Sequence, residues 1–589
     1  MMDNISAVCT VKRKPSHPIL SQAWLLGPAF VSLGISLPAE AIPQGGTVVS
    51  GSATISQSGN ALKVVQTTDK AAINWRSYNI SAAESVTYYQ PSSQSITLNR
   101  VLGGSTSFID GRLTANGQVW LSNPAGILFG PNARVNVGGL IATTHDLKVE
   151  EFNADRYRFK SDVQPSGIVE NQGRITVADA GLAAFVAPGV VNHGVITARL
   201  GEVTLASGNE FTVDLYGDQK INLSLDNKVA KQVLGRDGKQ LTSLVKNDGQ
   251  IFADGGRVQI TAAAAKGIVD NVVSIGGIVQ AHSVEESNGE IVLLGEGGVV
   301  QVSGTLDASG KAAGRTGGMV TATGDSMRVK SGARIDVSGT AGGGQALIGG
   351  DFRGGGASAA EYAEYALRPA RKPVPPAETT TVEAGAVLNA DALSTGRGGE
   401  LIVWSDGATS VKGGLTARGG AGGGDGGFIE TSGHWLDQTG ATISATASHG
   451  VGGTWLLDPY NLTISGTATT AATAAGPPYT FTSGASGTVV LASDIQAQLN
   501  SGVSVVLQTS GTSGDGHGNG DITIAANITK SSGGDASLLL SAFHDIINNG
   551  FSISSTSGKL NTYLQANNTG YGGDIVFYGS IRVKLARQL

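Results

Sequence analysis

The sequence has almost no cysteine. Cys9 is the single cysteine in a chain of 589 residues. A chain with one cysteine forms no internal disulfide, so cross-links of this kind are excluded as a source of stability. The fold therefore has to be held by burial of apolar side chains and by backbone hydrogen bonds. The chain also carries no cross-link that would block its threading through a pore in an extended form.

Charged and aromatic residues are scarce as well. Charged residues make up 15% of the chain and aromatic residues 5%, whereas ordinary globular chains have about 25% charged residues. The formal net charge is −6 at pH 7. This mildly acidic balance, without long basic runs, disfavours nucleic-acid or heparin binding as the main function.

Glycine is abundant, with 87 residues, about twice the usual share of ~7%. No strict Gly-X-Y period is present, which excludes a collagen triple helix. Val, Ile and Leu recur at alternating positions along most of the chain, so a disordered chain fits less well than one built of short strands.

The N-terminus has the pattern of a long export signal. Lys12-Arg13-Lys14 is basic, residues 19–37 are broadly apolar, and Ala39-Glu40-Ala41 has the A-x-A form of a cleavage site. We therefore predict a signal peptide over residues 1–41 and a mature chain that begins at Ile42. Polar residues and a proline interrupt the apolar stretch, which leaves an N-terminal membrane anchor as the less favoured alternative.

The region from 113 to 137 reads as strands separated by tight turns. Val119, Leu121, Ile127, Phe129, Val135 and Val137 keep one alternating phase, so we expect these six side chains to point into a core. Gln118, Trp120 and Ser122 fall on the opposite face. The segment Asn123-Pro124-Ala125-Gly126 has the residue preferences of a type I turn. Short strands and turns at short intervals indicate a coil of parallel strands.

This region also resembles a known family. Six segments match, in the family's order, the secretion domain of the two-partner-secretion exoproteins, the filamentous-haemagglutinin-like family. They are QTTDKAAINW (66–75), YQP (89–91), LNRV (98–101), LTANG (113–117), NPAGI (123–127) and VNVGGL (135–140).

The resemblance implies a secretion motif within these segments. Its residues are Asn116, Gly117, Asn123, Pro124, Ala125, Gly126 and Ile127. The family usually has asparagine where this chain has Ala125; the turn tolerates that change, because position i+2 of a type I turn accepts most residues. We expect Asn123 to be exposed enough to meet a partner, since turns lie at the surface and carry function more often than strands do.

Repeats follow the motif. Units of an Asn or small residue, a glycine and an alternating strand begin near Asn171, Asn192, Asn247 and Ser274. Later units are spaced by 28 residues, from Gly304 to Gly332 and from Gly385 to Gly413, with two recognisable strands each. A fixed period in the range of about 20–50 residues is typical of a solenoid.

Two segments interrupt the repeats. Residues 148–160 are polar and are predicted to form an excursion. Residues 360–381 are rich in proline, which suits a surface loop with one helical turn better than a strand; a hinge between domains is the alternative. Past residue 450 the segment GGTWLLDPYNLTI (452–464) is similar to one in large adhesins of the family, and the apolar strand near the end suggests an interrupted passenger.

Candidate catalytic and metal-binding residues are few. Ser432, His434 and Asp437 lie within six residues, but a hydrolytic triad is a spatial arrangement, and we interpret them as a turn. Asp307, Asp336 and Asn389 occupy equivalent places in successive repeats and predict a polar ladder. Residues 514–522 weakly resemble a Gly/Asp calcium repeat but occur once. The eight His show no metal-ligand spacing, and no phosphate-loop motif is present.

Together these observations predict an all-β protein, a right-handed parallel β-helix with an N-terminal cap. We expect a signal peptide (1–41), a secretion domain with the first coils (42–300), Gly-rich repeats with a Pro-rich loop (301–450) and a truncated adhesin-like repeat segment (451–589).

The predicted function is that of a non-enzymatic, haemagglutinin-like adhesin without cofactor or metal. It would be secreted or surface-exposed in a Gram-negative bacterium and exported through the periplasm by an outer-membrane β-barrel transporter with periplasmic domains. A host-cell or matrix glycan or protein is the expected receptor. The alternatives are a β-helical carbohydrate-active enzyme and the stalk of a contact-dependent toxin without its effector.

Overall fold

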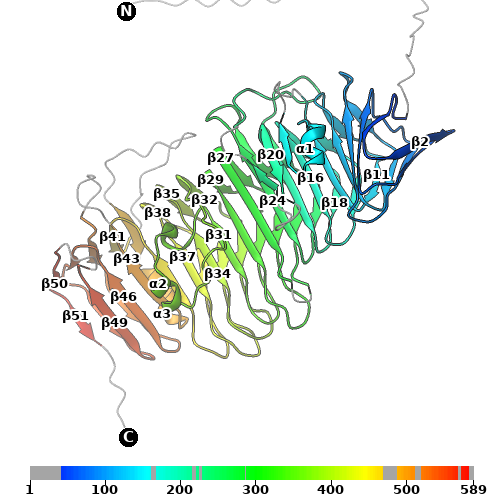
Figure 1. Cartoon of the computed structure of the whole chain (residues 1–589). Helices are drawn as coiled ribbons and strands as arrows, with labels where there is room; N and C mark the ends of the chain where they lie inside the picture. Colours follow the sequence, from blue (N-terminus) through cyan, green and yellow to red (C-terminus); the bar gives the residue numbers. More distant parts are fainter. Residues whose placement is uncertain are drawn as a thin grey trace, which may run out of the picture. The chain divides into compact units, whose positions relative to one another are not determined.

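The computed structural model describes residues 42–160, 167–214, 221–223, 228–284, 287–467, 487–510, 519–567 and 572–582. The predicted signal peptide lies outside these residues. Nearly all described elements are strands, and they stack in parallel from one coil to the next (Figure 1). The prediction of a parallel β-helix is confirmed. No helix in the described part of the chain is both long and apolar enough to span a membrane.

Most coils have three strands, and in two coils the second and third run together as β27 (Glu290–Val302) and β29 (Met319–Val329). One complete coil consists of β8 (Arg112–Ala115), β9 (Gln118–Ser122) and β10 (Ile127–Phe129). The next consists of β11 (Arg134–Val137), β12 (Gly139–Thr143) and β14 (Val169–Asn171), and each of its strands pairs in parallel with its counterpart. The sequence revealed only two strands per repeat, because the third is either continuous with the second, as in β29, or made of mostly small and polar residues, as in β35 (Ala408–Val411).

The pairing of strands in neighbouring coils follows the repeat predicted from the glycine spacing. Thr305 of β28 (Thr305–Asp307) aligns with Arg334 of β30 (Arg334–Asp336), and Val387 of β33 (Val387–Asn389) aligns with Gly414 of β36 (Gly414–Thr416). Aligned strands are therefore 29 and 27 residues apart in sequence, one more and one fewer than the spacing of the glycines.

An antiparallel cap closes the N-terminal end. The strands β2 (Ala53–Ser58) and β3 (Ala61–Gln66) form a hairpin, and β1 (Thr47–Ser50) runs antiparallel to β4 (Lys70–Trp75). Parallel stacking then begins where β3 meets β5 (Ser85–Tyr89) and where β4 meets β6 (Ile96–Val101). The paired hairpin covers the edge that the first coil would otherwise expose.

A continuous apolar core runs through the stack. The side chains of Val119, Leu121, Ile127, Phe129, Val135 and Val137 are all at most 2% exposed and belong to this core, so their predicted inward phase is confirmed. Stacking of rings from different coils adds to it, as where Phe129 lies nearly parallel to Phe185 at 5.7 Å between centroids.

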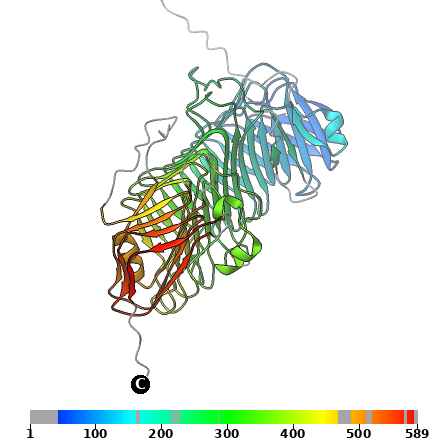
Figure 2. The same ribbon diagram turned by 90° about the vertical axis from the view of Figure 1, so that its left-hand side faces the viewer.

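Two segments pack on the outside of the coils. The helix α1 (Val149–Asn153) and the antiparallel strands β13 (Tyr157–Lys160), β20 (Glu210–Val213) and β21 (Ile221–Leu223) form one of them. The second is residues 349–377, which we call the outer flap; it contains α2 (Ala359–Glu364), which stands outside the stacked strands in Figure 2.

The outer flap matches the predicted loop in part. The expected helical turn is α2, which begins with a capping box between Ser358 and Glu361. The flap is not a free loop, however, because Phe352, Tyr362, Leu367 and Val374 pack onto the strands beneath it. Since β31 (Gln345–Ile348) pairs directly with β34 (Glu400–Val403), the coils continue across the flap without a hinge.

Towards the C-terminus the sheets change. One face of the coils ends at β39 (Thr442–Ser444), and five- and three-stranded sheets continue from β41 (Leu462–Ser465) onward. The helix α3 (Ala492–Asn500) packs there with Ile495 and Leu499 buried. The domain boundaries proposed near 300 and 450 stay predictions.

Candidate functional site

The turn at Asn123 is held by its own side chain. Gly126 N donates to Asn123 O at 2.9 Å, which is the bond from position i+3 to i of a β-turn. The Asn123 Oδ1 accepts from Ala125 N at 3.0 Å, and its Nδ2 donates to Ser105 O at 3.0 Å and Ser107 Oγ at 2.9 Å. The predicted turn is therefore present, and it is tied to the preceding coil.

The prediction that Asn123 is exposed is wrong. Its residue exposure is 0%, because the amide group points toward the coil and not toward solvent. Gly126 has φ +107°, a conformation that side chains other than glycine rarely adopt, and Ile168 O lies 3.0 Å from where a Cβ would stand. Both ends of the turn are therefore fixed by the fold.

The outward part of the motif is Pro124 and Ala125. Pro124 is exposed and Ala125 is half-buried. Ala125 borders a hollow of about 180 Å³ whose lining includes Leu234 and Arg236. An asparagine at position 125, as the family usually has, would lie at this hollow. The alanine of this chain therefore changes the solvent-accessible side of the turn, which Pro124 and Ala125 form.

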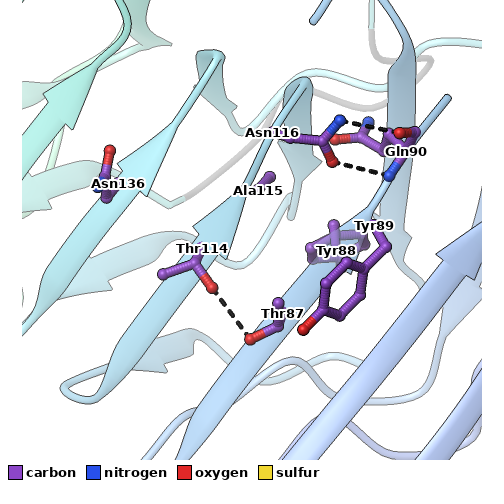
Figure 3. A pocket seen from close by; sticks show the side chains of 8 residues that line it. All are labelled: Thr87, Tyr88, Tyr89, Gln90, Thr114, Ala115, Asn116 and Asn136. Atoms are coloured by element: carbon purple, nitrogen blue, oxygen red, sulfur yellow. Dashed lines mark hydrogen bonds between the residues drawn. The ribbon is translucent and has the colours of Figure 1, made fainter. Parts of the chain in front are cut away.

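Asn116 and Gly117 join two coils (Figure 3). Asn116 Nδ2 donates to Gln90 O at 2.8 Å, and Asn116 Oδ1 accepts from Gln90 N at the same distance. Gly117 N donates to Gln90 Oε1 at 2.9 Å, and a Cβ on Gly117 would lie 2.6 Å from Ser95 O. These two residues therefore have structural roles, and Gln90 is their buried partner.

The core beside the motif contains a polar network that the alternating pattern did not reveal. Asn99 Oδ1 accepts from Trp75 Nε1 at 3.0 Å and from Tyr88 OH at 2.8 Å, and the hydroxyl groups of Tyr88 and Tyr78 lie 2.8 Å apart. All four residues are at most 2% exposed. Burial raises the pKa of both tyrosines, so they remain neutral hydrogen-bonding groups.

Trp120 lies on the outer face, as predicted, but is not exposed. Its ring meets Tyr157 edge-on at 5.0 Å, Phe159 at 5.8 Å and Phe152 at 6.0 Å. These rings come from the polar segment 148–160, which therefore covers the coils instead of leaving them. The signal was present in the sequence as three aromatic residues spaced among charged ones.

The residues considered for hydrolysis are not brought together. Ser432 Oγ accepts from Asp458 N at 3.1 Å, His434 stacks on Tyr460 at 3.7 Å, and Asp437 Oδ2 lies 3.4 Å from Lys412 Nζ. Each side chain has a different partner. Residues 432–434 form the expected turn between strands, but Asp437 is the last residue of the strand β38 (Trp435–Asp437) and not part of that turn.

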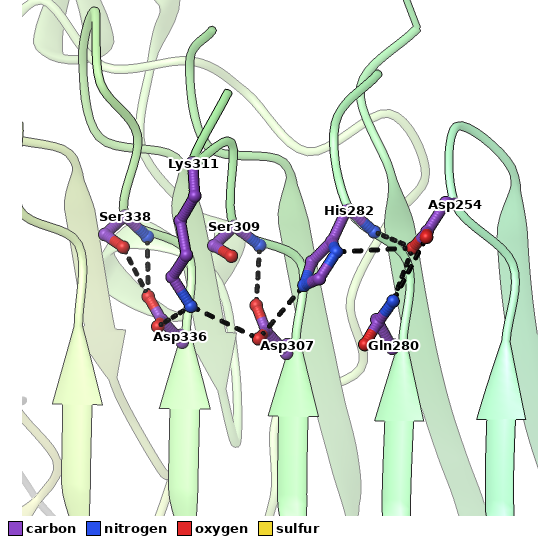
Figure 4. Close-up of polar contacts among 8 residues, drawn as sticks. All are labelled: Asp254, Gln280, His282, Asp307, Ser309, Lys311, Asp336 and Ser338. Atoms are coloured by element: carbon purple, nitrogen blue, oxygen red, sulfur yellow. Dashed lines mark hydrogen bonds and ion pairs between the residues drawn. The ribbon is translucent and has the colours of Figure 1, made fainter. Parts of the chain in front are cut away.

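The predicted polar ladder exists and is longer than expected (Figure 4). Asp307 aligns with Asp336, and Asp336 aligns with Asn389. Lys311 Nζ lies 3.4 Å from Asp307 Oδ2 and 3.0 Å from Asp336 Oδ2. His282 Nε2 lies 3.1 Å from Asp307 Oδ2, and this carboxylate raises the pKa of His282. Alternating charges thus cross-brace three successive coils.

One cluster has the composition of a cation site. Asp521, His544 and Asp545 present ligand atoms within 4.8 Å of one another, which the sequence did not predict because 23 residues separate the first two. Asp521 Oδ1 also accepts from Asp545 N at 3.0 Å. Residues 514–518 of the segment that weakly resembles a calcium repeat lie outside the described residues.

Two buried carboxyl groups lie beneath the outer flap. Glu430 stands between Ile402 and Leu456 on neighbouring coils and is 0% exposed. Burial raises the pKa of Glu430 to about 8 and that of Asp458 to about 6. Arg353 N donates to Glu430 Oε2 at 3.3 Å.

Comparisons with known proteins agree with this architecture. The family model of the TPS secretion domain matches residues 39–313. A heme/hemopexin-binding protein of Haemophilus influenzae is 32% identical over 278 residues, which cover 46% of this chain and 29% of the relative. A second protein of the same name and species is 30% identical over 280 residues, 43% of this chain and 28% of that relative.

A solved structure is similar over a larger share of the chain. The crystal structure of the HMW1 secretion domain from Haemophilus influenzae has a TM-score of 0.58 and 31% identity, covering 71% of this chain and 100% of that domain. This chain spans less than a third of the length of the two curated relatives. The comparisons do not favour a carbohydrate-active enzyme or a toxin carrier.

Proposed function

Because this chain belongs to the two-partner-secretion exoprotein family, we propose that its secretion motif is read by the transporter before the chain folds, and that folding ends the contact. The partner would be an outer-membrane β-barrel with periplasmic domains. The proposal rests on the hydrogen bonding of Asn123. Its side-chain amide is fully buried, and both the nitrogen and the oxygen of that amide form hydrogen bonds within the fold.

A partner can reach that amide only while the coil is open. In an extended chain the segment 113–130 exposes its backbone groups, which can add as a strand to an open sheet edge of a periplasmic domain. Closure of β9 and β10 onto β12 and β14 consumes the same groups. Binding to the transporter and folding are then mutually exclusive, so the folded coil releases the chain outside.

The test compares folded and unfolded forms against the purified periplasmic domains. A synthetic peptide of residues 105–144 should bind, and the folded chain should not. An Asn123→Ala peptide should bind more weakly, whereas an Ala125→Asn peptide should bind equally or better. Binding of the folded chain at the strength of the peptide would show that the transporter reads the outward Pro124 and Ala125 instead.

Export itself provides the second measurement. Asn123→Ala should lower folded stability by about 1–3 kcal/mol, because its buried partners lose their hydrogen bonds. Asn192→Ala is the matched control, because this buried asparagine lies outside the motif and likewise loses one accepted and one donated side-chain hydrogen bond, to Asn171 and Asn247. Extracellular yield should fall further for Asn123→Ala than for a control of equal stability. If yield follows stability alone across the series, the turn has only an architectural role.

For the coils downstream of the secretion domain we propose an adhesive role without enzymatic activity. What supports it is their regularity: strands continue in register from β24 (Arg257–Ala263) to β40 (Thr454–Leu457) and display polar rows such as the Asp307 ladder. Beads coated with the secreted chain should attach to host-cell monolayers more than beads coated with residues 42–313 alone. Equal attachment would argue against this role.

A further inference from the structure

Ile42 begins the described chain in an unusual setting. Its backbone nitrogen donates a hydrogen bond to Glu84 Oε2 at 3.0 Å. Its side chain is 1% exposed and belongs to the apolar core. The same Glu84 oxygen accepts from Ser81 N at 2.7 Å, and Gln44 Nε2 donates to Ile42 O at 3.1 Å. Ile42 is therefore locked in place, with its nitrogen against a carboxylate.

The backbone of Ile42 is also strained while a residue precedes it. Its φ is +66°, and a positive φ is a genuine outlier for a β-branched residue. The clashes that disfavour this conformation involve the carbonyl group of the preceding residue. An amino-terminal isoleucine has no such carbonyl, so removal of Ala41 would relieve the strain without moving Ile42.

We propose that Glu84 is the acceptor for the α-ammonium group that Ile42 would carry after cleavage of the signal peptide predicted over residues 1–41. A leader peptidase would hydrolyse the Ala41–Ile42 bond: the C–N bond breaks, water supplies the hydroxyl of the new Ala41 carboxylate, and the amine of Ile42 takes up a proton. The inference rests on the proposed export, because only an exported chain meets such a peptidase.

The geometry suits the product better than the precursor. An amide offers one N–H and no charge, whereas an ammonium offers three N–H donors and a positive charge beside the carboxylate, and charge-assisted hydrogen bonds are the stronger kind. Glu84 is already held by Ser81 N, so its oxygen needs no rearrangement. The family-model match covers residues 39–313, so both Ile42 and Glu84 lie within the matched domain.

Processing would thus complete the N-terminal cap. Ile42 is tied through Glu84 to the loop that precedes β5, and Gln44 pairs with Ser77 in the bridge that precedes β1. An ion pair at Glu84 would fasten the start of the chain to the first coil. The leader would then act as a folding delay, because the cap reaches its full stability only after the leader is removed.

A double-mutant cycle on the full chain tests the pairing. Four proteins are compared: chains that begin at Ile42 or at Ala41, each with Glu84 or with Glu84→Gln. The extra residue should lower the thermal midpoint by several degrees when Glu84 is present and by much less when it is replaced. Glu364→Gln, which removes an exposed carboxylate elsewhere, is the matched control and should leave the effect of the extra residue unchanged.

The rate at which the α-amine reacts provides a second test of the pairing with Glu84. In the chain that begins at Ile42, acetylation of the α-amine at pH 7 should be about tenfold slower than in the unfolded chain, as expected for a pKa raised by about one unit. Glu84→Gln should restore the rate. Equal effects of the extra residue in both backgrounds, or an α-amine that reacts as freely as in the unfolded chain, would overturn the pairing.

N-terminal sequencing of the exported protein separates this inference from the proposed function. Exported chains that begin anywhere other than Ile42 overturn the processing site but leave export standing. If no chain is exported, the proposed function fails, and the cycle on refolded protein still decides whether Glu84 binds the amine.

Discussion

At the scale of single residues, Glu430 couples folding to pH. Its pKa is about 8 in the folded chain against a usual 4.5, because burial disfavours the charged form. The folded state therefore binds the proton more tightly than the unfolded state does. The stability that this group contributes is complete below about pH 4.5 and is lost as the pH rises toward 8, and Asp458 acts in the same direction up to about pH 6.

We expect the free energy of unfolding in urea to fall by on the order of 2–4 kcal/mol between pH 5 and pH 8. Glu430→Gln keeps the shape and removes the titration, so most of this fall should disappear. Glu364→Gln, on the exposed side of α2, should leave the fall unchanged. A fall of the same size in Glu430→Gln would place its origin elsewhere.

Asn123 shows what residue patterns can and cannot predict. Its turn followed from local chemistry, since asparagine, proline and glycine at these positions favour a β-turn whatever surrounds them. Its burial did not, because that depends on Ser105 and Ser107, which the previous coil places beside it. The residue pattern along one strand contains no information about which side chains the previous coil places beside it.

At the scale of elements, the sheet of β13, β20 and β21 depends on Trp120. This ring is fully buried on the outer face of β9 and meets three aromatic rings of the covering segment. Trp120→Ala should cost about 3–5 kcal/mol and loosen the covering sheet from the coils. Limited proteolysis should then cut residues 148–160 much faster while the coils remain intact.

Trp120→Phe is the matched control. It keeps an aromatic contact and should lose less stability, with little change in the cleavage rate. If Trp120→Ala unfolds the coils and the covering sheet together, the outer sheet is not a separate unit but part of the core.

The elements themselves were largely predictable. Alternation and glycine spacing gave the strands of the coils and their parallel stacking. The same pattern missed the third strand of the repeats, such as β35 (Ala408–Val411), whose mostly small and polar residues show no apolar alternation. It also assigned the wrong surroundings to residues 148–160, where Tyr157 and Phe159 alternate with charged residues and cover another sheet instead of facing solvent.

At the scale of the whole molecule, the requirement that the chain carry no disulfide during export can be tested by introducing one. Asn136 and Thr176 are register partners on neighbouring coils, and the spacing of paired strands suits a disulfide. Asn136→Cys with Thr176→Cys would close a loop in the periplasm, where disulfides form. We expect extracellular yield to fall severalfold and to recover when a reductant is added.

Each single cysteine variant serves as a control and should be exported normally. Recovery of the double variant outside the cell, at full yield and with its disulfide formed, would show that the chain does not need to cross the outer membrane as a single extended strand.

The antiparallel hairpin β2–β3 gives the stack a direction. Because that hairpin occupies the N-terminal edge, a new coil can be added only at the opposite end, where the last strand still offers unpaired backbone groups. A segment that emerges and pairs there can no longer slide back through a narrow channel. Folding would then act as a molecular ratchet that converts random thermal motion of the chain into net outward movement, so the energy that drives export can come from the coils themselves.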